Sequence, residues 1–283
     1  MSGNGLVWLN GSFMNFEEAR VSAEDRGFQF ADGVYEVVRV YGGKPFTFEE
    51  HLKRLRNSAS LIELQFQKED REFMEIGVEL ISRSGLKDAE LYIQVTRGVA
   101  PRSHSFPKDV SPTILLSIRP VRPLPCDAQE KGVSAITLPD ERWAHCDIKS
   151  ISLLPNVLAK EKARQVGAYE AIFYRDGLVT EGASTNVFAF LENVLTTPQA
   201  DRRILRGITR DLIIKIATSE RIRVEERDFR VSELSKASEV FLTSTAIELL
   251  PVVEIDRKKI GQGKPGPVWG LLYEKFLRLV RES

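Results

Sequence analysis

The spacing of hydrophobic positions in the first half of the chain switches between two periods: two residues, typical of strands, and about 3.6, typical of helices. Near the N-terminus, the dipeptide Asn10-Gly11 predicts a tight turn between two short strands. The other elements predicted in this half are strands at residues 34–41, 91–95 and 113–118 and helices at residues 48–64 and 68–84. The last two strands flank a loop at residues 98–112.

A proline-rich segment separates this half from the next. Pro120, Pro123 and Pro125 forbid a regular helix and stiffen the backbone, so their segment is a candidate linker. The elements predicted after it are strands at residues 133–138, 169–174, 178–180, 186–190, 240–243 and 252–255 and helices at residues 155–166, 207–219 and 267–281.

These patterns predict a mixed α+β fold with two domains. We expect a small N-terminal α+β domain at residues 1–119, a linker at residues 120–128, and a larger C-terminal α/β domain at residues 129–283. The pattern contains neither an internal repeat nor a low-complexity segment.

Composition and charge exclude several classes of protein. Lys+Arg and Asp+Glu both number 40, so the chain lacks the basic excess typical of nucleic-acid binding. It has no long uncharged apolar run typical of a membrane span, and its N-terminus has no secretory signal pattern. Two cysteines and three histidines offer neither a disulfide framework nor a metal site with recognisable spacing. We therefore expect a cytoplasmic protein without a metal.

The common catalytic templates are absent as well. The sequence has no GxGxxG after a strand, no GxxxxGK[ST], no GxSxG and no HExxH. Dinucleotide-dependent hydride transfer, P-loop phosphoryl transfer and zinc hydrolysis are therefore disfavoured.

Lys149 is the first candidate for chemistry. It follows residues 143–148, which we predict to be an apolar-leaning strand, so its amine is expected to be partly desolvated. Desolvation lowers the pKa of a lysine and frees the amine for Schiff-base formation. The alternative is an ordinary surface lysine.

Three further features suit a charged ligand. Glu181 begins a predicted turn of small and hydroxyl residues, which is otherwise a plain polar loop. Gly207 and Thr209 open a predicted helix, whose N-terminal amides suit a phosphate, although Thr209 could serve only as an N-cap. Arg102 and His104 could grip a carboxylate, or could be solvated loop charges.

In chain order, five stretches of the sequence resemble the fold-type IV pyridoxal-phosphate enzymes. This group contains branched-chain aminotransferases, aminodeoxychorismate lyases and D-amino acid aminotransferases. The resembling stretches are residues 25–30, 32–41, 50–55, 146–150 and 180–182. The resemblance covers nearly the whole chain and implies a two-domain subunit that uses pyridoxal 5′-phosphate to transfer amino groups.

The resemblance also implies roles for the cofactor-binding residues. Lys149 would hold the cofactor as a Schiff base and shuttle the substrate Cα proton. Glu181 would keep the pyridine nitrogen protonated, and Arg54 would pair with the phosphate. The remaining contacts implied are Leu205 on the ring face, Ile208 and Thr209 at the phosphate, and Ser244 and Thr245 on the phosphate side.

On the substrate side, the resemblance is to the D-amino acid aminotransferases. In that group a tyrosine and an Arg-x-His pair trap the substrate α-carboxylate, and the pair enters from the neighbouring subunit. Carried over, these residues are Tyr35, Arg102 and His104, and the implied assembly is a homodimer with a shared active site. The implied reaction moves the amino group of a D-amino acid such as D-alanine to a 2-oxo acid such as 2-oxoglutarate, giving D-glutamate.

Several alternatives stay open at this point. The same cofactor residues would serve an L-branched-chain aminotransferase or an aminodeoxychorismate lyase, although the Phe-Glu-Gly pattern of branched-chain enzymes is absent. A catalytically dead relative that only binds a ligand is a third possibility. Two departures from the group's pattern are Ala183, where Ser is common, and Pro155, where close relatives have Gly.

Overall fold

The computed structural model describes residues 5–283, which form two compact units. The first unit extends to Arg122 and includes the short segment Ile148–Ser152, whereas the second comprises Pro123–Asp147 and Leu153–Ser283. Lys149 therefore belongs to the first unit, although the residues on either side of its segment belong to the second. The expected division into a domain at residues 1–119, a linker at residues 120–128 and a domain at residues 129–283 stays a prediction.

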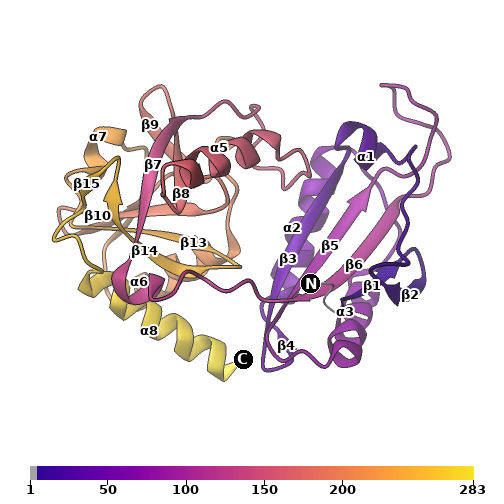
Figure 1. The fold of residues 1–283 in the computed structure, drawn as a ribbon, viewed down its shortest axis with the longest axis horizontal. Coiled ribbons are helices and arrows are strands. Elements are labelled where there is room, and N and C mark those ends of the chain that lie inside the picture. The colour runs from indigo at the N-terminus through magenta and orange to yellow at the C-terminus, as the bar shows by residue number, and fades with distance from the viewer. Residues whose placement is uncertain (1–4) are drawn as a thin grey trace. The chain divides into compact units, whose positions relative to one another are not determined.

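The N-terminal unit is built on an antiparallel sheet. In the part of the chain that is described, this sheet has six strands in the order β2-β1-β6-β5-β3-β4. The strands are β1 (Leu6–Leu9), β2 (Ser12–Asn15), β3 (Gly33–Tyr41), β4 (Lys44–Pro45), β5 (Ala89–Thr96) and β6 (Thr113–Pro120). Helices α2 (Phe48–Leu61) and α3 (Asp70–Ser84) pack against the sheet, and the short α1 (Arg26–Phe30) precedes β3 (Figure 1).

Strand β3 has the alternating burial of a strand with one face toward a core. Val34, Val38 and Val40 are fully buried against α2 and α3, whereas Tyr35 on the other face is half-buried. Glu36 lies among the buried valines on the core side, and it is fully buried too. A buried carboxylate at such a position needs partners, and helix α2 supplies them.

The C-terminal unit contains a mixed sheet. Within the described residues it has nine strands, eight of them in the order β12-β11-β10-β13-β14-β7-β8-β9, with β15 paired to β14. The strands are β7 (Val133–Pro139), β8 (Glu170–Arg175), β9 (Leu178–Gly182), β10 (Asn186–Leu191), β11 (Val194–Thr197), β12 (Val224–Glu226), β13 (Glu239–Ser244), β14 (Glu248–Ile255) and β15 (Lys258–Lys259). The helices are α4 (Ala128–Lys131), α5 (Leu154–Gln165), α6 (Ile208–Ser219), α7 (Val231–Leu234) and α8 (Pro267–Glu282).

The mixed α+β class is confirmed, and so are the predicted strands and helices outside the Lys149 region, to within a few residues at their ends. Two local expectations were wrong. Residues 143–148 form turns and irregular backbone instead of a strand, and Glu181 lies in strand β9 instead of a turn. Pro155 is accommodated in the first turn of α5, where its missing N–H costs no helical hydrogen bond.

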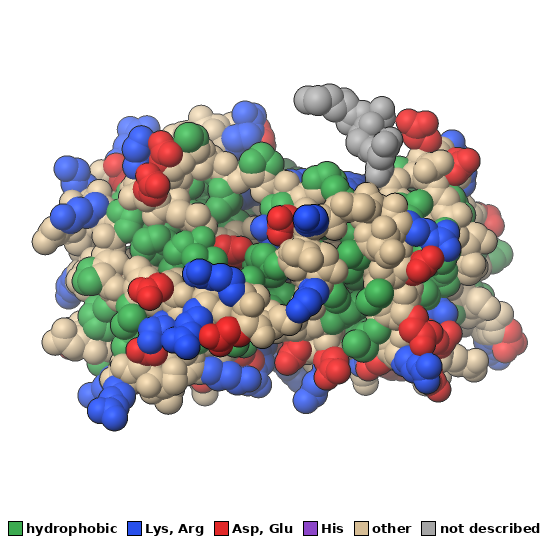
Figure 2. All heavy atoms as spheres, turned by 90° about the horizontal axis from the view of Figure 1, so that it is seen from below, with side chains coloured by type: hydrophobic (Ala, Val, Ile, Leu, Met, Phe, Trp, Pro, Cys, Tyr) green, Lys and Arg blue, Asp and Glu red, His purple; other side chains and the backbone are tan. Residues whose placement is uncertain are grey.

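The surface agrees with the balanced charge count. Figure 2 shows basic and acidic side chains interspersed over the face in view, as expected for 40 residues of each sign. Among residues 5–283, no helix is both long enough and apolar enough to cross a membrane.

Candidate active site

The backbone of Lys149 is fixed by hydrogen bonds to two elements of the N-terminal unit. Its carbonyl accepts the N–H of Tyr35 in β3 at 3.0 Å, and its own N–H donates to the Ser58 hydroxyl of α2 at 3.1 Å. The neighbouring Ile151 N–H donates to the Gly33 carbonyl at 3.1 Å. The segment therefore lies along the start of β3 like a short extra strand, and its position comes from these contacts rather than from a strand of its own.

The Lys149 side chain lies over the ring of Tyr35. The distance from Lys149 Nζ to the ring centroid is 4.4 Å, within the range of a cation–π contact. The Tyr35 ring also contacts a second aromatic ring, that of Tyr92, which stacks on it with 5.7 Å between centroids. The structure thus brings together two of the predicted site residues, Lys149 and Tyr35.

Arg54 is held by the buried carboxylate of Glu36. Nε and Nη2 of Arg54 donate to the two Glu36 oxygens at 2.7 and 2.9 Å, and His51 Nδ1 lies 2.7 Å from Glu36 Oε2. Burial raises the pKa of Glu36, but the charge and hydrogen bonds of Arg54 outweigh it and hold this pKa well below its usual range. Burial also lowers the pKa of His51 despite the nearby carboxylate, so the neutral imidazole donates its Nδ1 proton to Glu36.

Arg102 and His104 lie together on the loop after β5, and both contact one aromatic ring. The Arg102 guanidinium is 4.4 Å from the Phe30 ring centroid, and the His104 ring is 5.4 Å from it. Both side chains are exposed. Their contacts are with Phe30, whereas Tyr35 contacts Lys149 and Tyr92, so the structure pairs the two loop residues with each other but not with the tyrosine.

Arg26 in helix α1 anchors this loop, a role to which no sequence motif points. It is 4% exposed, and its Nη1 donates to the carbonyls of Ser103 at 2.5 Å and Ser105 at 3.3 Å. Its Nε donates to Asp32 at 2.8 Å. The backbone on either side of His104 is therefore tied to α1.

Glu181 is buried in the C-terminal unit with partners on both oxygens. Arg142 Nη1 donates to Oε1 at 2.5 Å, while Asn186 Nδ2 and the Leu205 N–H donate to Oε2 at 3.1 and 3.0 Å. Burial raises the pKa of Glu181 to about 7, against the opposing charge of Arg142. Leu205, predicted as an apolar contact, thus also holds the carboxylate through its backbone.

Within residues 5–283, no side chain caps the first amides of helix α6. Its N-cap is Gly207, which has extended backbone geometry, so Thr209 lies inside the first turn and is not the cap. A Cβ at Gly207 would meet Asn186 Oδ1 at 2.0 Å, so a larger residue there would have to displace the Asn186 side chain that donates to Glu181. Uncapped amides at the positive end of a helix dipole form an anion-binding geometry, and Ile208 and Thr209 contribute to it.

Ser244 and Thr245 lie where β13 ends. Ser244 pairs with Glu248 across the sheet, and its hydroxyl accepts the Ile247 N–H at 3.4 Å. Both residues are half-buried, so their hydroxyls lie near the surface of the C-terminal unit.

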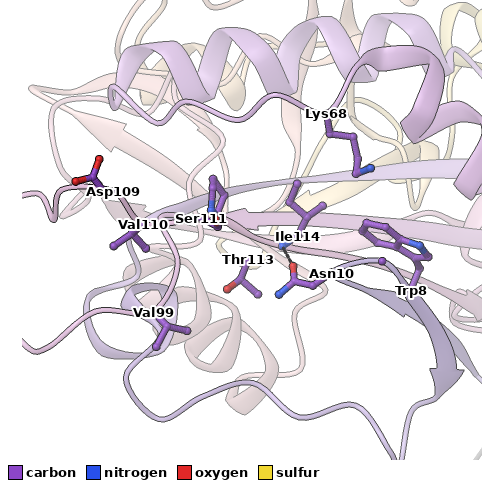
Figure 3. A pocket seen from close by; sticks show the side chains of 11 residues that line it. Trp8, Asn10, Lys68, Val99, Asp109, Val110, Ser111, Thr113 and Ile114 are labelled. Atoms are coloured by element: carbon purple, nitrogen blue, oxygen red, sulfur yellow. Dashed lines mark hydrogen bonds between the residues drawn. The ribbon is translucent and has the colours of Figure 1, made fainter.

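A cavity of about 640 Å³ in the N-terminal unit is not part of this set of residues. Figure 3 shows it between the β1–β2 turn and the loop before β6. Three of its polar side chains already have partners: Asn10 Oδ1 accepts the Ile114 N–H at 2.8 Å, Thr113 Oγ1 donates to Asp25 at 2.6 Å, and Lys68 pairs with Glu72 at 3.0 Å. None of the predicted site residues lines it.

The donor set fits pyridoxal phosphate. An amine that can bind an aldehyde (Lys149), an oriented guanidinium (Arg54) and the open helix start after Gly207 suit a phosphorylated aldehyde. The buried carboxylate of Glu181, which no charged group other than Arg142 contacts by hydrogen bond among the described residues, suits a protonated pyridine nitrogen.

Comparisons with known proteins agree with this chemistry. The D-alanine aminotransferase of Staphylococcus haemolyticus is 44% identical over 274 residues, 97% of each chain, and that of Bacillus licheniformis is 44% identical over 262 residues, 93% of this chain and 92% of the relative. Among solved structures, the branched-chain amino acid aminotransferase of Escherichia coli has a TM-score of 0.91 at 29% identity, covering 97% of this chain and 94% of that one. The T.th. branched-chain amino acid aminotransferase with pyridoxamine 5′-phosphate has a TM-score of 0.90 at 29% identity, covering 98% and 94%.

The family model described as amino-transferase class IV matches residues 33–255, which include Lys149, Glu181 and the start of helix α6. The match spans most of the chain and agrees with relatives that are similar over nearly their whole length. The chain therefore belongs to the class IV aminotransferases.

Proposed function

We propose that this aminotransferase moves amino groups between D-amino acids, such as D-alanine, and 2-oxo acids, such as 2-oxoglutarate. Relatives that are 42–44% identical are named D-alanine aminotransferases, whereas the similar branched-chain structures are 28–29% identical. The observation that carries the proposal is that Arg102 and His104 both contact Phe30 and are both exposed, as binding of a carboxylate requires.

The enzyme uses pyridoxal 5′-phosphate, the cofactor of its family. When bound, this cofactor supplies an electron sink for the electron pair left at the substrate Cα after its proton departs. The protein's task is to hold the reacting groups in place and to move that proton.

Lys149 is proposed to bind the cofactor through Nζ and to act as the general acid–base. When it is not bound to the cofactor, Nζ would take the substrate Cα proton and later return one. The hydrogen bonds of its backbone to Tyr35 and Ser58 fix where the side chain begins, which would confine the nitrogen to one side of the substrate. That restriction is what would give the reaction its stereochemistry.

Two groups are proposed to bind the cofactor's charged ends. Arg54, oriented by Glu36, would pair with the phosphate, and the first amides of α6 with the Thr209 hydroxyl are also assigned to it. Ser244 and Thr245 are assigned to the phosphate side and Leu205 to the ring face. Glu181 would accept the N–H of the protonated pyridine.

A homodimer is part of the proposal, with Arg102 and His104 acting in the partner's active site. Large apolar side chains are exposed close to this pair in the sequence, with Phe106 54% and Val99 43% exposed. Phe28, two residues before the Phe30 that both side chains contact, is 77% exposed. Exposed apolar residues of this size are typical of an interaction surface. The cytoplasmic location expected from the sequence stays a prediction.

A panel of amino donors tests the proposal. With 2-oxoglutarate as acceptor, we expect D-alanine to support turnover at a rate well above that of L-leucine, L-isoleucine or L-valine. Faster turnover with the L-branched-chain donors would favour the second candidate, a branched-chain aminotransferase, which the similarity to the Escherichia coli structure suggests. Repeated release of pyruvate from aminodeoxychorismate, with no amino acceptor present, would instead indicate a lyase.

A further inference from the structure

A buried arginine, Arg142, lies behind the Glu181 carboxylate, and its orientation is fixed. Its Nε and Nη2 donate to the two oxygens of Asp140 at 2.9 and 2.8 Å, and its backbone N–H donates to Asp140 Oδ1 at 3.1 Å. Nη2 also donates to the Arg203 carbonyl at 3.3 Å, and the guanidinium lies 4.7 Å from the Phe173 ring centroid. Only 7% of the side chain is exposed, so Arg142 is clamped on several sides.

The clamp aims the remaining nitrogen, Nη1, at Glu181. The bond to Oε1 is 2.5 Å, while Oε2 takes its two donors from Asn186 and Leu205. A carboxylate offers about four acceptor positions. Three are therefore occupied by the protein, and one on Oε1 remains for a donor outside it.

The charge of Arg142 opposes the effect of burial. Burial raises the pKa of Glu181 to about 7, and the charge and hydrogen bond of Arg142 are the main influences that lower it. The other charged groups of this cluster are Asp140, which raises the pKa of Glu181, and Arg175, which lies 3.5 Å from Asp140. Without Arg142, burial and Asp140 would both favour the protonated acid, which has no charge to stabilise a cation.

We propose that Arg142, oriented by Asp140, is a positioning residue that keeps Glu181 ionised, with Oε1 free to accept the pyridinium N–H of the cofactor. The proposal rests on the cofactor role given to Glu181 above. It adds that the charge of the pyridine nitrogen depends on a residue that binds neither cofactor nor substrate. The rate of Cα proton removal then depends on Arg142, because a protonated ring accepts electrons better.

The test is ¹⁵N NMR of the holoenzyme loaded with cofactor labelled at the pyridine nitrogen, at neutral pH. We expect the protonated signal in the natural protein and in Arg142→Lys, and a shift toward the unprotonated signal in Arg142→Met. Arg175→Met is the matched control, because it removes an arginine beside Asp140 that does not contact Glu181. Its signal should stay protonated.

The pH profile gives a second readout. In Arg142→Met we expect kcat at neutral pH to fall by roughly tenfold or more, with a smaller change in KM, and to recover as pH rises and Glu181 ionises. A purely structural role would lower cofactor content and stability while leaving the signal and the pH profile of the loaded fraction unchanged.

These outcomes distinguish the role proposed for Arg142 from the cofactor role proposed for Glu181. A protonated signal in both the natural protein and loaded Arg142→Met would overturn the role of Arg142 alone. An unprotonated signal in the natural protein would overturn the role of Glu181 as well. If Arg142→Met does not fold, Arg142→Gln, which removes the charge but keeps a polar side chain, should show a shift in the same direction, and an unchanged signal would overturn the proposal.

Discussion

The ammonium nitrogen of Lys149 lies 4.4 Å from the centroid of the Tyr35 ring, and the Tyr35 N–H donates to the Lys149 carbonyl at 3.0 Å. One strand, β3, therefore supports the lysine through both its backbone and a ring. The next residue of the same strand, Glu36, points to the other face and orients Arg54. Two groups of the proposed site thus depend on neighbouring positions of a single strand.

Replacing Lys149 with Ala should abolish covalent cofactor binding and turnover together. Borohydride reduction of the natural holoenzyme, followed by peptide mass spectrometry, should place the pyridoxyl group on Lys149. The matched control is Lys162→Ala, since Lys162 is an exposed lysine in helix α5. Turnover retained by the Lys149 variant, or a pyridoxyl group found on another lysine, would contradict the assignment.

Replacing Glu36 with Gln should strongly destabilise the N-terminal unit. The change removes the charge that Glu36 presents to the largely buried Arg54, and breaking a buried ion pair costs about 3–5 kcal/mol. The Arg54 charge lowers the pKa of Glu36 although burial raises it. The loss of unfolding free energy in Glu36→Gln should therefore be largest above the ordinary glutamate pKa of about 4.3 and should shrink as pH falls below that value.

Urea unfolding of the cofactor-free protein at several pH values measures this cost. Glu50→Gln, an exposed carboxylate change on the same helix as Arg54, is the control and should alter the unfolding free energy by less than about 0.5 kcal/mol. Equal effects of the two substitutions on the unfolding free energy would show that the Glu36–Arg54 ion pair does not stabilise the N-terminal unit.

Mixing two inactive variants tests whether Arg102 acts across a dimer. Lys149→Ala and Arg102→Leu should each lack activity with D-alanine. In a homodimer that supplies Arg102 in trans, subunit exchange creates one intact site in every mixed dimer, so about a quarter of the natural activity should return. Recovery requires unfolding and refolding the mixture, or co-expression, with each variant alone treated in the same way. No recovery, although mixed dimers have formed, would place Arg102 in the active site of its own subunit.

Glu181 should make the stability of the cofactor-free protein fall as pH rises toward neutrality. Its pKa is raised from 4.5 to about 7, so between these values the folded state holds a proton that the unfolded state has lost. This shift in the pKa of Glu181 corresponds to a change of roughly 3 kcal/mol in the free energy of unfolding. The stability of Glu181→Gln relative to the natural protein should therefore increase by up to that amount across this range.

Denaturant titrations of both proteins at acidic and slightly alkaline pH measure the difference. Glu192→Gln, an exposed change at the turn after β10, should give a difference that does not vary with pH. A difference for Glu181→Gln that is equally constant would mean that burial does not disfavour the ionised carboxylate.

Most of the fold was predictable from the periodicity of the chain, and the exceptions have physical causes. The hairpin at Asn10-Gly11 forms because both residues adopt positive φ, at 46° and 105°. Helix α1 has only five residues, too few to show a helical period, although its N-cap Asp25 is a typical start signal. The composition of the segment before Lys149 is strand-like, but in that segment the Cys146 N–H donates to the distant Arg202 carbonyl at 2.9 Å. Lys149 itself is tied to β3 and α2 by long-range contacts that periodicity does not reveal.

The site was predictable only where it consists of motifs. Lys149, Arg54 and Glu181 belong to stretches whose order along the chain resembles a known family. The residues that orient them do not: Arg142 and Glu181 are 39 positions apart, and Arg26 contacts a carbonyl 77 positions away. Such partners are set by how strands pair and loops pack, so a single sequence gives no signal for them.

The configuration of the product tests the central claim most directly. With D-alanine and 2-oxoglutarate as substrates and the purified holoenzyme as catalyst, chiral chromatography of the glutamate formed decides between the candidates. The proposed function predicts D-glutamate together with an equal amount of pyruvate. Glutamate formed only as the L-enantiomer would contradict it.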